Sequence, residues 1–77
     1  MTTDEIITLL QAIGVYTGKE VDEAAVAAWS EAARRRSWTF PEAIDAVHEH
    51  FADETGWIMP GHVTQLIRRV RGANWQD

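Results

Sequence analysis

Hydrophobic residues recur along this chain with the spacing of an α-helix, and the first such segment begins close to the N-terminus. Its apolar positions, three or four residues apart, are Ile6, Leu9, Leu10 and Ile13. This spacing places all of them on one face of a helix. Thr2 and Glu5 have the spacing of a capping box, and Gly14 is a typical helix end. We therefore predict a helix over 3–13 and a loop over 15–21.

The middle of the chain predicts two further helices. Asp22 is a favourable N-cap, and the alanine-rich segment after it has a high helix propensity, with Trp29 as its one large apolar anchor. This second helix is predicted over 22–35. Another capping-box pattern starts at Thr39 and opens a third helix, predicted over 40–52. The apolar side of the third helix consists of Phe40, Ala43, Ile44, Val47 and Phe51.

The last helix is predicted over 60–71. Pro60 suits its first position because the N–H that proline lacks would have no partner there. Apolar residues then recur at helical spacing as Val63, Leu66, Ile67 and Val70. Gly72 is predicted to end this helix, which leaves a short tail over 73–77.

Together these segments predict an all-α fold, a compact four-helix domain with short loops over 1–72. No segment alternates apolar and polar residues in the way of a half-buried strand. Trp38 and Trp57 lie at the boundaries of elements and are expected to pack onto the helices. The predicted core contains Ile6, Leu9, Leu10, Ile13, Trp29, Ile44, Val47, Phe51, Val63, Ile67 and Val70.

Length and composition narrow the class of protein. A domain of 77 residues buries only roughly 60–65% of its unfolded surface, so it has little room for a deep pocket beside its core. The absence of cysteine excludes disulfides, zinc–thiolate sites and thiol nucleophiles. The chain shows neither an apolar run of the ~20 residues that span a bilayer nor a basic leader. We therefore expect a cytoplasmic protein with no membrane partner.

Positive charge is concentrated in two clusters of arginines. The formal net charge is -5, yet residues 60–71 contain three arginines and no acid. Arginines near a helix C-terminus are favourable because the carbonyl end of a helix is partly negative. Clustered arginines are equally typical of a surface that binds phosphate or an acidic protein. Both interpretations stay open for the two clusters, which are Arg34, Arg35 and Arg36, and Arg68, Arg69 and Arg71.

The predicted partner-binding surface combines the arginines of the last helix with Trp75. The apolar side of that helix faces the core, so its arginines are expected to face outward. Arginine and tryptophan are both enriched among the residues that contribute most to protein interfaces. The arginines over 34–36 are the second candidate surface. In the alternative interpretation Trp75 folds back onto the domain, and the arginines of the last helix pair with Glu49, Asp53 or Glu54.

The remaining polar residues do not predict catalysis. His48 and His50 are two positions apart and project from different sides of a helix, so they do not predict a metal site. The acids of the third helix have the spacing of a solvated face. No glycine-rich phosphate loop, nucleophile elbow or Ser/His/Asp grouping is present. We therefore predict no catalytic residue, no cofactor and no metal.

The order of helices and large side chains forms a pattern of its own. A helix ends near Tyr16, a second helix has a central tryptophan, and an aromatic–Ile–x–Pro segment precedes the last helix. The quoted segments are Ala28-Trp29, Phe40-x3-Ile44-x2-Val47-x3-Phe51 and Trp57-Ile58-Met59-Pro60. Over residues 4–71 this pattern resembles the folded N-terminal domain of the phage replicative-helicase loader and inhibitor family. It also resembles small all-α proteins of related layout in phages of high-GC bacteria.

The resemblance implies a protein that is not an enzyme. Members of that family bind the hexameric helicase and help to deliver it to the phage origin, largely through a flexible C-terminal extension. In this chain residues 72–77 follow the predicted last helix, and no functional residue is carried over onto them.

Two functions follow from the sequence. The first is a small phage-encoded adaptor in the host cytoplasm that binds a replicative helicase or its loader and recruits or inhibits it. The alternative is a small DNA-binding or transcription-regulatory domain that uses the arginine clusters. The negative net charge favours the adaptor because domains that bind nucleic acid are usually basic overall. The sequence does not specify the oligomeric state.

Overall fold

The chain folds into four helices joined by short loops. The computed structural model describes residues 1–75, with side chains described as far as Gly72. The helices are α1 (Thr3–Thr17), α2 (Glu23–Arg36), α3 (Phe40–Asp53) and α4 (Pro60–Trp75). Residues 1–75 contain no strand. The predicted all-α, four-helix fold is therefore confirmed.

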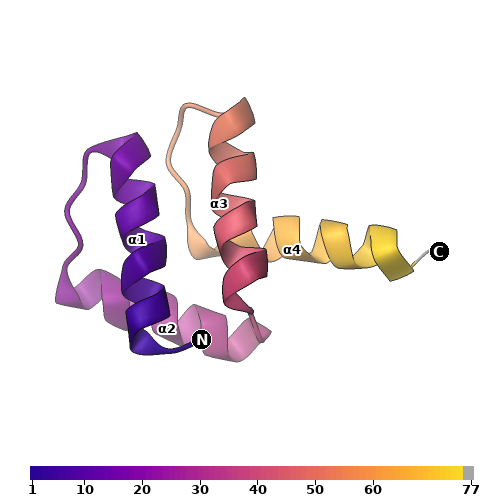
Figure 1. Cartoon of the computed structure of the whole chain (residues 1–77), viewed down its shortest axis with the longest axis horizontal. Coiled ribbons are helices and arrows are strands. Elements are labelled where there is room, and N and C mark those ends of the chain that lie inside the picture. The colour runs from indigo at the N-terminus through magenta and orange to yellow at the C-terminus, as the bar shows by residue number, and fades with distance from the viewer. Residues whose placement is uncertain (76–77) are drawn as a thin grey trace.

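Two of the helices, α1 and α3, run vertically in Figure 1, and the other two, α2 and α4, run across them. In Figure 1, α1 and α3 lie side by side and run in the same direction, and α2 crosses beneath them. α1 contacts α2 and α3, and α4 contacts α3 and α2. The second half of α4 projects beyond α3, away from the other helices (Figure 1). This projection contributes to the elongated outline of 39 × 26 × 16 Å.

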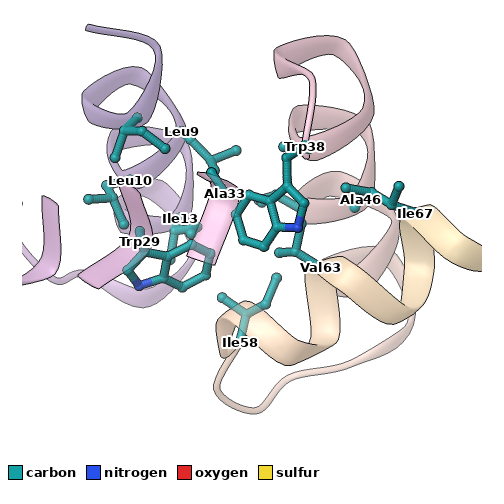
Figure 2. Packing of buried hydrophobic residues seen from close by; sticks show 13 residues of the cluster. Leu9, Leu10, Ile13, Trp29, Ala33, Trp38, Ala46, Ile58, Val63 and Ile67 are labelled. Carbon is teal, nitrogen blue, oxygen red and sulfur yellow. The ribbon is translucent and has the colours of Figure 1, made fainter. Parts of the chain in front are cut away.

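The core lies where the four helices meet and includes two residues from the connections, Trp38 and Ile58 (Figure 2). The Trp29 and Trp38 rings pack edge to face, with centroids 5.9 Å apart, a favoured aromatic geometry. The remaining buried residues are Ile6, Leu9, Leu10, Ile13, Ala33, Ala43, Ala46, Val47, Val63 and Ile67. Most of the predicted core is therefore confirmed.

Of the predicted core residues, Ile44 and Phe51 pack against the core without being fully buried, and Val70 is wrong. Ile44 and Phe51 are only partly buried, because α3 faces the core with Ala43, Ala46 and Val47. Phe51 lies at the edge of the core and stacks on Tyr16, with ring centroids 4.5 Å apart. Val70 is 50% exposed because it lies on the projecting half of α4. Helical spacing predicted correctly which side of α4 faces the core. It did not predict how far along α4 the neighbouring helices cover that side.

Trp57 is not packed onto the helices as predicted. Its side chain is 60% exposed, whereas that of the next residue, Ile58, is 4% exposed. The loop before α4 therefore turns Ile58 into the core and Trp57 outward. The Lys19 ammonium lies 3.8 Å from the centroid of the Trp57 ring, a cation–π contact at the surface. Trp38, by contrast, is buried as predicted.

The N-termini of the helices follow the predicted caps. Thr2 Oγ1 accepts a hydrogen bond from the Glu5 N–H, and the Thr2 N–H donates to the Glu5 carboxylate, completing the capping box. Asp22 and Thr39 cap α2 and α3 through their side chains. α4 begins at Pro60, as predicted.

Two predicted C-termini are wrong. α1 does not end at Gly14 but continues to Thr17, where Gly18 adopts a left-handed conformation with φ 75°. Gly14 allows a close approach inside the helix: a Cβ atom on Gly14 would lie 2.5 Å from the carbonyl oxygen of Lys19. α4 likewise continues through Gly72 to Trp75, because a glycine ends a helix only where it adopts the left-handed conformation.

The position of Trp29 predicts a large loss of stability on truncation. Trp29→Ala removes an indole from the core and leaves a cavity, so we expect the free energy of unfolding to fall by about 3–5 kcal/mol. Val15→Ala is the control, because the Val15 side chain is 84% exposed. Urea denaturation followed by circular dichroism measures both. If Trp29→Ala and Val15→Ala unfold at similar urea concentrations, the core assignment is wrong.

The approach of Lys19 to Gly14 predicts an unusual response to alanine. In a helix, alanine is normally more stable than glycine by about 0.5–1 kcal/mol. Gly14→Ala should nevertheless lower the melting temperature, because its Cβ meets a backbone carbonyl that cannot rotate away. Gly72→Ala is the matched control, since a Cβ at Gly72 meets no heavy atom within 4 Å. A rise in melting temperature for Gly14→Ala would contradict the described packing of the 18–21 loop.

Candidate partner-binding surface

One buried tryptophan, Trp38, fixes the connection between α2 and α3. Ser37 ends α2 in the left-handed conformation, with φ 54°, and its N–H donates to the Ala33 carbonyl. The chain then turns Trp38 into the core, where 3% of the side chain is exposed. The Trp38 indole N–H donates to Thr64 Oγ1 on α4 at 3.0 Å. The C-terminal end of α2 is thereby fixed against the first half of α4.

This contact brings the two arginine clusters together. A hollow of about 310 Å³ lies between the end of α2 and α4. Trp38, Thr64 and Ile67 lie among its lining residues. The arginines that line it are Arg35 and Arg36 from α2 and Arg68 and Arg71 from α4, and we call this surface the basic hollow. Two arginines from each predicted candidate surface therefore line one hollow.

The arginines of α4 are exposed as predicted, but they do not all lie on the same surface. Arg68 and Arg71 are three positions apart, so they lie on the same side of the helix and both line the basic hollow. Arg69 projects from a different side of α4 and lines the groove between α3 and α4. The same 3.6-residue period that separates core from surface also separates these arginines.

Arg71 has a structural contact of its own. Its guanidinium donates to both carboxylate oxygens of Glu42, at 2.7 and 2.6 Å, and to the Ser37 carbonyl at 3.1 Å. This two-point ion pair ties α4 to the start of α3 and to the corner after α2. The hydrogen bonds from Arg71, and a further one from the Thr39 hydroxyl, lower the pKa of Glu42 to about 2. The sequence-based alternative named Glu49, Asp53 or Glu54 as the partner acid, which is wrong for Arg71.

The arginines of α2 differ in their partners. Arg34 and Arg35 both donate to the Glu31 carboxylate, and these hydrogen bonds lower the pKa of Glu31 to about 2. Arg34 does not line the basic hollow. Arg36 donates only to the backbone, to the Arg35 carbonyl at 3.3 Å. Among the side chains described, which end at Gly72, neither Arg36 nor Arg68 forms an ion pair.

Trp75, the remaining member of the predicted surface, is the last residue of α4. Its side chain lies outside the described residues. The described lining of the basic hollow consists of its four arginines together with Ser37, Trp38, Thr64 and Ile67.

The histidines take part in contacts within the domain. The Tyr16 hydroxyl and His48 Nδ1 are 2.8 Å apart and join α1 to α3. His62 Nδ1 accepts a hydrogen bond from the Met59 N–H at the start of α4, and the His50 and His62 ring centroids are 5.2 Å apart. In residues 1–72, no group of three or more His, Asp or Glu side chains is arranged to hold a metal ion.

Sequence reasoning missed the residues that assemble the basic hollow. Ser37, Thr64 and Glu42 have no feature that marks them as its supports. Trp38 was expected only to pack onto the helices, and its hydrogen bond to a residue 26 positions away has no local signature. The one signal that could have suggested the site was the presence of two arginine clusters in an acidic chain.

The geometry described above is the main evidence on the function of this chain, because comparisons with known proteins add none. No protein-family model, curated protein or solved structure matches the chain. Among the described residues, no helix has the length and apolar character needed to cross a bilayer.

The Glu42–Arg71 ion pair predicts a pH-dependent contribution to stability. The pKa of Glu42 is lower in the folded chain than its ordinary value of 4.5. The ion pair therefore stabilises the fold above about pH 4.5, and this contribution is lost as the pH falls towards about 2. We expect Glu42→Gln to melt several degrees below the wild type at neutral pH, and the difference to shrink in acid. Thermal denaturation followed by circular dichroism over this pH range measures it.

Glu49→Gln is the matched control for this prediction. Glu49 is exposed on the same helix and forms no ion pair with a described side chain. Its removal should change the melting temperature little at any pH. If the effect of Glu42→Gln stays the same down to about pH 3, it does not come from the charge of the carboxylate.

Proposed function

We propose that this protein is a small adaptor that acts by binding and not by catalysis. It docks its basic hollow onto an acidic surface of a replication protein, either the replicative helicase or its loader, and recruits or inhibits it in the host cytoplasm. The observation that carries this proposal is the convergence of Arg35, Arg36, Arg68 and Arg71 on one hollow of a chain whose net charge is -5.

The energetics of the hollow support a protein partner. Arg36 and Arg68 have no ion pair among the described side chains, so a partner carboxylate does not have to displace an existing one. The buried Trp38 and Ile67 behind them are held by core packing, which limits the ordering cost of binding. The rest of the surface is acidic and repels an acidic partner, so charge orients the encounter towards this face.

The assignment to replication rests on the resemblance of the helical pattern to helicase loaders. The features that carry it include Trp29 in the middle of a helix and the Trp57–Pro60 segment before the last helix. In the described fold Trp29 lies within α2, and residues 57–59 belong to the connection that precedes α4. The distribution of arginines does not depend on that resemblance, and by itself it supports a function in binding.

A nucleic-acid partner is the second candidate. Guanidinium groups that converge from two helices have the chemistry that binds phosphate oxygens. Such binding would weaken steeply with salt, because each neutralised phosphate releases counterions and lowers log K by about 0.9 per tenfold rise in salt. Binding to an acidic protein through a partly buried contact should depend less on salt.

The proposed function predicts that reversal of two charges abolishes capture of the partner. Tagged wild-type protein and the variant Arg36→Glu/Arg68→Glu are used as baits in a lysate of a high-GC bacterium, and the captured proteins are identified by mass spectrometry. We expect a replicative helicase or loader with the wild type. Measured with that purified protein by calorimetry, the variant should bind at least about tenfold more weakly, which corresponds to about 1.4 kcal/mol.

Lys19→Glu is the control, because it reverses one charge in the connection after α1, at a residue that does not line the basic hollow. Equal loss of binding in both variants would show a general effect of charge and not a site. Anisotropy with a labelled DNA duplex tests the second candidate. Salt-sensitive DNA binding that the double variant abolishes, without capture of a replication protein, would replace the adaptor by a nucleic-acid-binding domain.

A further inference from the structure

A second surface, which shares only Ile67 with the described lining of the basic hollow, lies between α3 and α4. It is a groove of about 420 Å³. Its apolar lining consists of Pro41 and Ala46 from α3, and Leu66, Ile67 and Val70 from α4. Leu66 is only partly buried and Val70 is 50% exposed. The groove therefore leaves apolar surface in water beside the projecting half of α4 (Figure 1).

The two walls of this groove have opposite charges. The α3 wall presents Asp45 and Glu49, and the α4 wall presents Arg69. All three side chains are exposed, and none of them forms an ion pair with a described side chain. Glu42 also lines the groove, but its carboxylate is engaged by Arg71.

We infer that this groove is an interface for a second copy of the same chain. In a dimer with two-fold symmetry the same patch is used twice, so the patch must be complementary to itself. Rotation about a two-fold axis that runs along the groove brings the α4 wall of one copy opposite the α3 wall of the other. Arg69 then faces Asp45 of the partner subunit, and the reverse contact forms at the same time.

The charge pattern favours a second copy over a partner of a single sign. An acidic segment in the groove would meet Asp45 and Glu49, and a basic segment would meet Arg69. An occupant with both signs can pair Arg69 with an acid and Asp45 with a base at the same time. The groove of a second copy offers both, with Asp45 on its α3 wall and Arg69 beside Leu66 and Val70 on its α4 wall. Packing of these apolar side chains against their counterparts removes exposed apolar surface from water.

This dimer leaves the basic hollow accessible. Arg68 lines the basic hollow and does not line the groove, whereas Arg69 does the opposite. The dimer therefore does not depend on the proposed function, and each can fail without the other. If both hold, the dimer presents two basic hollows to a multisubunit partner and raises the avidity of binding.

The dimer is tested first by sedimentation of the wild-type chain over a series of concentrations. The measured mass should rise from 8.7 kDa towards twice that value through the micromolar range, as expected for an interface of modest size. Val70→Asp places a charge in the apolar contact and should keep the chain monomeric over the same range. Val15→Asp makes the same change on α1, at an 84% exposed site, and should dimerise like the wild type.

A sharper test mixes two charge variants. In Arg69→Glu alone, the introduced carboxylate would face Asp45 of the partner subunit, and in Asp45→Arg alone two guanidinium groups would face each other. Each variant should therefore dimerise at least tenfold more weakly than the wild type. An equimolar mixture brings opposite charges together across the interface, so heterodimers should form. Contacts within one chain cannot produce this rescue, because no chain in the mixture carries both substitutions.

Three results would overturn the inference. The first is a wild-type mass that stays at the monomer value up to about 1 mM. The second is dimerisation of Val70→Asp to the same extent as the wild type. The third is a mixture of the two charge variants that stays monomeric while the wild type dimerises. Circular dichroism confirms that each variant is folded. Should Val70→Asp not fold, the charge variants decide the question, since Asp45 and Arg69 are exposed.

Discussion

The Trp38 side chain holds together the parts of this domain on which its surfaces depend. Its indole is buried at the junction of α2, α3 and α4, packs edge to face on Trp29 and donates its N–H to Thr64. A buried N–H without a partner costs free energy, so the hydrogen bond to Thr64 makes one position of α4 much more favourable than its neighbours. The end of α2 and the first half of α4 are thereby brought together, so that Arg35 and Arg36 at the end of α2 and Arg68 and Arg71 on α4 line one hollow.

A domain of this size has too few helices to cover every apolar side chain, and α4 shows the consequence. Its first half contributes Val63 and Ile67 to the core, whereas its second half projects beyond α3 and exposes Val70. Exposed apolar surface beside a groove with charged walls is characteristic of an interface. The projecting helix thus separates two surfaces, with the basic hollow on one side and the α3–α4 groove on the other.

The arginines of α4 have three different roles although they lie within four positions of one another. Arg71 is engaged by Glu42 and contributes to the fold, Arg68 belongs to the basic hollow, and Arg69 belongs to the groove. The helical period accounts for the separation of Arg69 from the other two. The difference between Arg68 and Arg71 has another cause, because it depends on which carboxylate another helix brings within reach.

The sequence by itself determined the features that depend on neighbouring residues. The four helices, the caps at Thr2, Asp22 and Thr39, the start at Pro60 and most core positions were predicted correctly, because capping and periodicity act within a few residues. The tertiary structure decided what depends on distant partners. It turned Ile58 inward and Trp57 outward, left Val70 beyond the reach of α3, and kept Gly14 inside α1 against the Lys19 carbonyl. It also brought two arginines of each cluster to one hollow, since the Trp38–Thr64 contact that holds α2 and α4 together spans 26 positions and has no periodic signature in the chain.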